Sequence, residues 1–166
     1  MDKSAIVVNQ KILEIIEKPL AERDVNLYIG KAARALAQIL QSDGLLVLRV
    51  DEGPDVSEKM SITYSLPGTP TSIVFEPEAF PTTPKDGETI RIDSKSVKNI
   101  GDTNSAKSYD FFATQFGNSQ KTHLLIVGLI KSESTKLEEN SLQTLAICSK
   151  ILGAYYEMIY LLNTYA

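Results

Sequence analysis

The spacing of hydrophobic residues near the N-terminus predicts a helix over residues 4–18. Its apolar positions form two stripes, one through Ile12 and one through Ile16, so this helix has two surfaces to pack against. The ring of Pro19 and its missing N–H predict that the helix ends or kinks at that residue.

A second helix is predicted over residues 25–42, where apolar residues recur every three or four positions. Asp24 is a residue type that caps a helix N-terminus, because its carboxylate accepts hydrogen bonds from free N–H groups of the first turn. Gly44 follows the helix and is expected to adopt the left-handed conformation that ends it.

The middle of the chain predicts strands joined by turns and loops. An apolar run over 45–50 indicates a buried strand, and alternation over 60–66 indicates an antiparallel partner for it. Short strands are also expected over 72–75 and 89–93. Five of the seven prolines lie in 67–84, so most of that segment is predicted as loop, as is the polar segment 94–108.

The last third of the chain predicts a β-hairpin followed by a long helix. Residues 111–116 and 121–131 are the two strands, with 117–120 as the turn. Thr135 and Glu138 have the spacing of a capping box, and the helix is expected to reach about Leu162. About 27 residues extend roughly 40 Å, more than the chain needs to cover its own sheet. This helix also has two stripes: Leu142, Leu145, Leu152, Tyr156 and Ile159 on one side, and Ile147, Ile151, Ala154, Met158 and Leu161 on the other.

The predicted order is therefore helix, helix, strand, strand, loops, three strands and helix. Helices at both ends of a strand-rich middle indicate an α+β sandwich with an antiparallel sheet. A chain of 166 residues has the length of one domain, so residues 1–166 are expected to form a single unit.

Composition narrows the classes of function. Hydrophobic residues make up 43% and charged residues 23%, which is a globular composition. The net charge of −4 gives no general attraction to nucleic acid or to anionic membranes. The longest apolar run, 124–130, is too short to cross a bilayer, and the first residues do not resemble a secretion signal. The expected location is the cytoplasm.

Residues 33–48 have the sequence ARALAQILQSDGLLVL. Together with a second segment near the C-terminus, they resemble the GAF domain family, a group of sensory modules, in which a similar helix leads into the first strand. The run LLIVGLI over 124–130, followed after a loop by LEENSLQTLA over 137–146, resembles its last strand and closing helix. Gly128 stands in the place of a common glycine of the family.

The resemblance implies a six-stranded antiparallel sheet with the N-terminal and C-terminal helices packed on one face. It also implies that the loops 67–84 and 94–108 close over a ligand pocket on the other face. In many GAF domains the terminal helices pair with those of a second subunit. Such pairing requires a second apolar stripe on each helix, as is found here. The related PAS and profilin-like sandwiches are alternative folds for the same pattern of elements.

This resemblance leads to a first hypothesis: the protein is a non-catalytic regulatory module that binds a small molecule and acts through a homodimer. The candidate dimer interface consists of the helices at 1–20 and 136–166. A second hypothesis is an interaction or scaffold subunit that has no ligand and acts through a separate effector protein. The candidate pocket residues are Tyr64, Asn99, Asp102, Tyr109, Phe111 and Thr114. The candidate partner residues are Ile12, Ile16, Ile151, Tyr155, Met158 and Leu162.

Several activities found among GAF relatives need residues that this chain does not have. Cys148 is the only cysteine and is expected in the middle of a helix, so neither bilin attachment nor chemistry that needs a cysteine pair is supported. His123 is the only histidine, which excludes a multi-histidine metal site. No phosphate-binding glycine motif is present. We therefore expect no enzyme activity, no metal and no cofactor.

Overall fold

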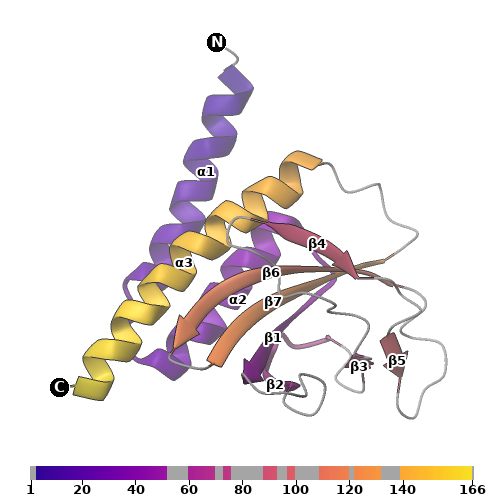
Figure 1. Ribbon diagram of the computed structural model, residues 1–166. Helices are drawn as coiled ribbons and strands as arrows, with labels where there is room; N and C mark the ends of the chain where they lie inside the picture. Colours follow the sequence, from indigo (N-terminus) through magenta and orange to yellow (C-terminus); the bar gives the residue numbers. More distant parts are fainter. Residues whose placement is uncertain are drawn as a thin grey trace.

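The computed structural model describes residues 3–51, 60–69, 73–75, 88–92, 97–99, 109–119, 122–131 and 139–165. In chain order the elements are α1 (Lys3–Leu20), α2 (Val25–Leu40), β1 (Gly44–Asp51), β2 (Met60–Ser65), β3 (Ile73–Phe75), β4 (Thr89–Ile92), β5 (Val97–Asn99), β6 (Tyr109–Ser119), β7 (Thr122–Lys131) and α3 (Glu139–Tyr165) (Figure 1). The predicted capping box at Thr135 and Glu138 falls outside these described residues.

The ends of α1 and α2 follow from local chemistry. Helix α1 continues through Pro19 and ends one residue later. The carboxylate of Asp24 accepts hydrogen bonds from the N–H groups of Asn26 (3.0 Å) and Leu27 (3.2 Å), which confirms it as the N-cap of α2.

The C-terminal end of α2 differs from the prediction. Gln41 adopts the left-handed conformation (φ 55°, ψ 44°), so the expectation that Gly44 would do so is wrong. The helix stops earlier because the N–H groups of Gln41 and Ser42 turn back to the carbonyls of Gln38 and Ala37. Gly44 is then the first residue of β1.

The strands form one five-stranded antiparallel sheet, in the order β2-β1-β7-β6-β4, and a separate pair of β3 with β5. The predicted β1–β2 pair and β6–β7 hairpin are both present. The main sheet thus has five strands rather than about six. Strand β5 lies in a segment predicted to be loop, because three residues with one apolar side chain give no periodicity. It exists through antiparallel pairing with β3.

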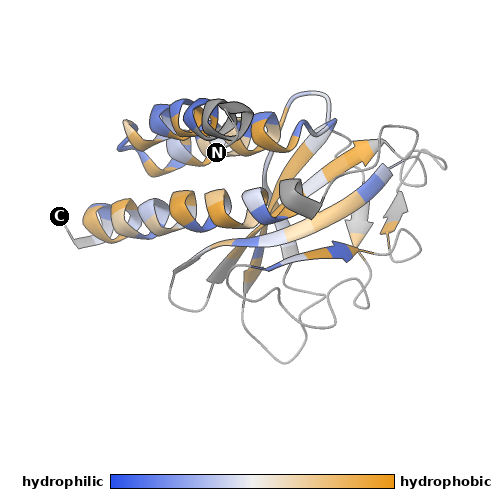
Figure 2. Cartoon of the chain, turned by 90° about the horizontal axis from the view of Figure 1, so that it is seen from above, coloured by the Kyte–Doolittle hydropathy of each residue, from blue (hydrophilic) through white to orange (hydrophobic). Residues whose placement is uncertain are grey.

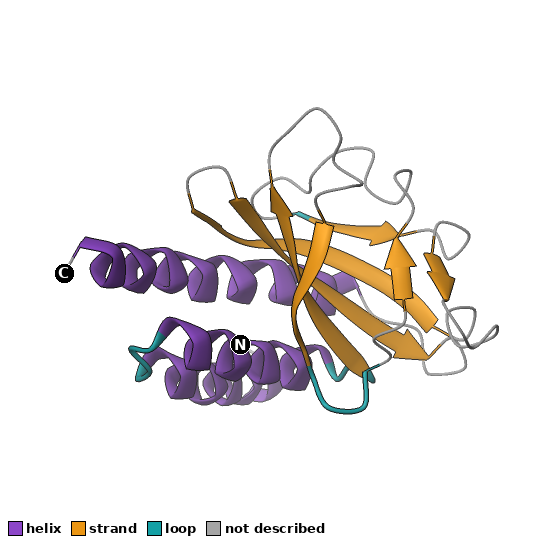
Figure 3. Ribbon diagram, turned by 90° about the horizontal axis from the view of Figure 1, so that it is seen from below, coloured by secondary structure: helices purple, strands orange, loops and turns teal. Residues whose placement is uncertain are grey.

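Helices α2 and α3 cover one face of the sheet, α1 packs on these two helices, and β3 and β5 lie on the other face (Figure 3). Alternate residues along each strand therefore enter two different cores. On β1, Val47 packs under the helices, whereas Leu46 and Leu48 belong to the opposite core. We call these two surfaces the helix face and the far face.

Helix α3 lies directly on the backbone of β6. A Cβ atom added at Gly153 would be 1.2 Å from the carbonyl oxygen of Phe116, so only glycine allows this approach. The ladder between β6 and β7 shifts its register between Gln115 and Gly117, at the same place. The hydroxyl of Ser149, one helical turn before Gly153, donates to the Gln115 carbonyl (2.8 Å) and gives α3 a second attachment to β6.

We predict that Gly153→Ala destabilises the fold by about 3 kcal/mol or more, because the new methyl group must push the helix away from a strand backbone. Urea unfolding followed by circular dichroism measures the change. Gly30→Ala is the matched control, since its methyl group would meet the movable ring of Tyr64 at 3.2 Å. An equal loss in both variants would contradict this account of the α3 position.

Candidate functional site

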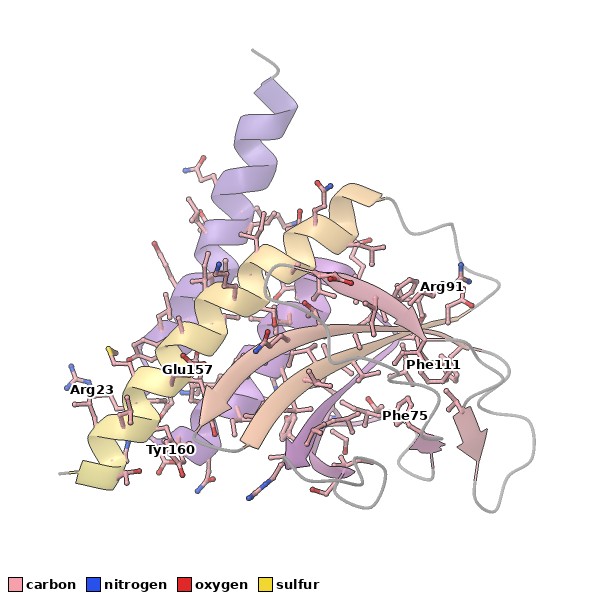
Figure 4. The ribbon with its side chains drawn as sticks, viewed as in Figure 1. Arg23, Phe75, Arg91, Phe111, Glu157 and Tyr160 are labelled. Atoms are coloured by element: carbon pink, nitrogen blue, oxygen red, sulfur yellow. The ribbon has the colours of Figure 1, made fainter. Side chains whose placement is uncertain are left out.

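The far face, where the ligand pocket is predicted, carries a packed aromatic pair. Phe111 on β6 is 0% exposed, and its ring lies edge-on to Phe75 of β3 with centroids 6.0 Å apart (Figure 4). Tyr109, two residues before Phe111, is half-buried against the same core. Strand β5 adds the buried Val97.

Two predicted pocket residues lie on the opposite, helix face. Tyr64 packs its ring against Gly30 of α2. Thr114 is 1% exposed, and its hydroxyl donates to the Glu88 carbonyl (2.9 Å).

Four of the six predicted pocket residues have described side chains, and the sheet separates them into two pairs, so these four do not line one cavity. Tyr109 and Phe111 share the far face, whereas Tyr64 and Thr114 lie under the helices. Asn99 lies in β5, where its backbone pairs with Ile73. Asp102 falls outside the described residues.

The outer side of α3 carries an exposed apolar stripe that we call the α3 seam. Figure 2 shows hydrophobic residues recurring along this helix. The spacing of the stripe alternates between four and three residues, the heptad pattern of a coiled-coil seam. The exposed fractions are 59% for Ile147, 45% for Ile151, 46% for Met158 and 53% for Leu161. The seam consists of these four residues and the exposed Ala154.

The candidate partner residues divide between surface and core. Ile151 and Met158 belong to the seam, and Leu162 beside them is 62% exposed. Ile16 is only 5% exposed, since it packs in the helix-face core of its own chain. The other two, Ile12 and Tyr155, are partly buried against the same core.

Helix α3 also has the length and composition of a membrane span over Leu142–Thr164. However, 44% of this stretch is buried within the fold, as in a helix that packs on a protein core. One side of α3 lies on β6 and α2, so only the seam side is open to another surface.

A half-open groove of about 530 Å³ lies where the C-terminal part of α3 meets the turn between α1 and α2. Figure 4 shows Arg23 of that turn beside the last turns of α3. The Asn163 side chain joins the two elements by donating to the Arg23 carbonyl (3.4 Å). We call this the Arg23 groove. It is lined by Arg23, Tyr155, Met158, Ile159, Leu162 and Asn163.

Sequence reasoning placed Tyr155, Met158 and Leu162 on a partner surface but did not identify Arg23, Ile159 or Asn163 as candidates. Arg23 is 140 residues from Asn163 along the chain. No local pattern brings them together, because the contact depends on how the α1–α2 turn crosses the end of α3.

The described residues contain no cluster of histidine, cysteine, aspartate or glutamate side chains that could hold a metal ion. Cys148 is buried on the inner side of α3, and burial raises the pKa of its thiol to about 11. At neutral pH this thiol is protonated, so it is a poor nucleophile.

We predict that Cys148 reacts at least about a hundredfold more slowly with a thiol reagent at pH 8 in the folded protein than in guanidinium, because its thiolate is scarce and shielded. Ellman's reagent measures both rates. Because burial raises the pKa of Cys148, its protonated thiol stabilises the folded state fully below about pH 9, and this stabilisation is lost as the pH rises towards 11. Equal rates in the folded and unfolded chain would contradict the buried position.

No protein-family model matches the amino-acid sequence, and a comparison with curated proteins finds no match. Solved structures do match. A GAF domain from Pseudomonas syringae pv. tomato superimposes with a TM-score of 0.61 at 11% identity, covering 98% of this chain and 93% of that one.

Two further structures show the same architecture. The third GAF domain of a Synechocystis protein, in its photoproduct state, matches with a TM-score of 0.55 at 14% identity, over 86% of this chain and 99% of that one. Residues 122 to 287 of a methyl-accepting chemotaxis protein match with a TM-score of 0.57 at 15% identity, over 89% of this chain and 98% of that one. The chain therefore has a GAF-like fold.

Proposed function

We propose that this protein is a non-catalytic regulatory module of signal transduction, located in the cytoplasm, whose terminal helices pair with those of a second copy. The GAF-like fold supports a sensory role, since one similar structure belongs to a chemotaxis protein. In this proposal a small molecule binds on the far face of the sheet and changes how the two copies pack. Its affinity must differ between the two arrangements, because otherwise it transmits nothing.

The α3 seam is the observation that carries this proposal. A stripe of large apolar side chains at heptad spacing, each about half exposed, leaves hydrophobic surface that the chain does not cover itself. Heptad spacing matches the seam of a second helix, where each side chain enters a gap between four residues of the partner. A second copy supplies that helix.

We predict that the wild-type protein is a dimer of about twice 18.3 kDa and that Ile151→Glu makes it a monomer. A carboxylate within the seam would be buried without a partner in the dimer, which opposes association. Light scattering coupled to gel filtration measures the mass. Leu27→Glu is the matched control, because Leu27 is another exposed large apolar residue (58% against 45% for Ile151) and lies on α2, outside the seam.

A wild-type protein that stays monomeric at about millimolar concentration would remove the dimer from this proposal. A dimer that persists in Ile151→Glu would instead place the interface on another surface.

For the ligand, Tyr109, Phe111 and Asn99 are the candidate residues that belong to far-face elements. Tyr109 is half-buried, so it offers an aromatic surface and a hydroxyl to a molecule held there. The tight Phe75–Phe111 pair favours the second function, an interaction subunit without a ligand that acts through a separate effector protein, since a packed face needs no ligand to fill it.

A thermal-shift screen with nucleotides, amino acids and organic acids separates the two functions. The sensor proposal predicts that at least one compound raises Tm, because a ligand that binds only the folded state stabilises it. Tyr109→Phe should reduce that shift, whereas Tyr160→Phe on α3 should leave it unchanged. A dimer whose Tm responds to no compound would favour the interaction subunit.

A further inference from the structure

We propose that the Arg23 groove is a separate binding site for a single-chain amphiphile with a terminal carboxylate, of the fatty-acid type. The carboxylate would meet the guanidinium of Arg23, and the chain would lie along Met158, Ile159 and Leu162. This site is on the helix side of the molecule, so it is distinct from the far face to which the proposed sensor ligand is assigned.

The charges around Arg23 favour an anion. Its two acidic neighbours in the sequence already have other partners. The Glu22 carboxylate pairs with Lys31 and accepts the Asp24 N–H (3.3 Å), and these bonds lower the pKa of Glu22. The Asp24 carboxylate caps α2. The guanidinium of Arg23 forms no ion pair with any other described residue, and no carboxylate lines the groove.

The hydrogen-bond donors of the other polar side chains in the groove already have partners. The Tyr155 hydroxyl donates to the Glu22 carbonyl (3.2 Å). The Asn163 amide donates to the carbonyls of Ile159 (2.7 Å) and Arg23 (3.4 Å). The guanidinium is therefore the cationic donor that this lining offers to a ligand, and the rest of the lining is mainly apolar.

The end of a helix carries partial negative charge, which would oppose an anion at this place. In α3 the side chains of the last turn reduce this effect. Asn163 donates to the Ile159 carbonyl, and the Thr164 hydroxyl donates to the Tyr160 carbonyl (2.8 Å). Arg23 adds a full positive charge beside them.

The dimensions and the chemistry of the groove both fit such a ligand. Its volume of about 530 Å³ is within the usual range for small-molecule sites, which combine an apolar lining with few polar groups. A planar guanidinium can form two parallel hydrogen bonds with one carboxylate. An apolar chain covers the parts of Met158 and Leu162 that are exposed to water in a single copy of the protein.

The test uses decanoate as the probe and isothermal titration calorimetry as the measurement. It is made in the full chain with Ile151→Glu, because Ile151 lies outside the groove and dimerisation cannot then cover Met158 or Leu162. Saturable binding of one decanoate per chain is expected. Octanoate should bind about fivefold more weakly or worse, since it has two fewer methylene groups to bury.

Arg23→Gln should weaken decanoate binding at least about tenfold, because it removes the charge-assisted hydrogen bonds. The backbone carbonyl that accepts from Asn163 is unchanged, so the fold should persist, and circular dichroism checks this. Arg34→Gln, which alters an exposed arginine of α2 outside the groove, is the matched control and should bind normally.

The proposal is overturned if decanoate does not bind, if Arg23→Gln binds it as tightly as the control, or if decyltrimethylammonium binds equally well. The last two results would indicate non-specific attachment to apolar surface. Because the titration is made on the monomeric variant, its result does not depend on whether the wild-type protein dimerises.

Discussion

The contact between Gly153 and the Phe116 carbonyl is the constraint on which the rest of the helix layer depends. No side chain separates the two backbones, so α3 lies at a fixed distance and a fixed rotation on β6. Ser149 is bound to the Gln115 carbonyl on the same side. With that side held on the sheet, the residues at 147, 151, 154, 158 and 161 have to point outward. The exposed seam is therefore a consequence of the packing on the opposite side of the helix.

Aromatic side chains then join α2 to α3. Tyr28 is fully buried, donates its hydroxyl to the Leu152 carbonyl and lies 5.1 Å from the ring of Tyr155. Burial of Tyr28 raises the pKa of its phenol, so this donor keeps its proton over the physiological range. Tyr155 in turn binds the turn that carries Arg23. The groove at the end of α3 thus results from the same contacts that attach the first two helices.

The sheet separates the surface proposed for pairing of copies from the surface proposed for a ligand. The proposed pairing of copies uses the outer side of the helix layer, and the proposed sensory ligand binds on the far face. A ligand on the far face can change the packing of the helices only by acting through the strands that lie between them. Phe111 and its neighbour Phe112 project to opposite faces of β6, so a displacement of this strand would be felt in both cores at once.

Local patterns in the sequence determined much of the fold. The Asp24 cap, the β6–β7 hairpin and the two stripes of α3 depend on residues close together in the chain, where periodicity and hydrogen bonding are decided by neighbours. Tertiary structure decided the remainder. It assigned Tyr64 and Thr114 to the helix face and Phe111 to the far face, because the side of a strand that is covered depends on what packs there. It also formed β5 and brought Arg23 to the end of α3, since both need segments that are distant in the sequence to meet.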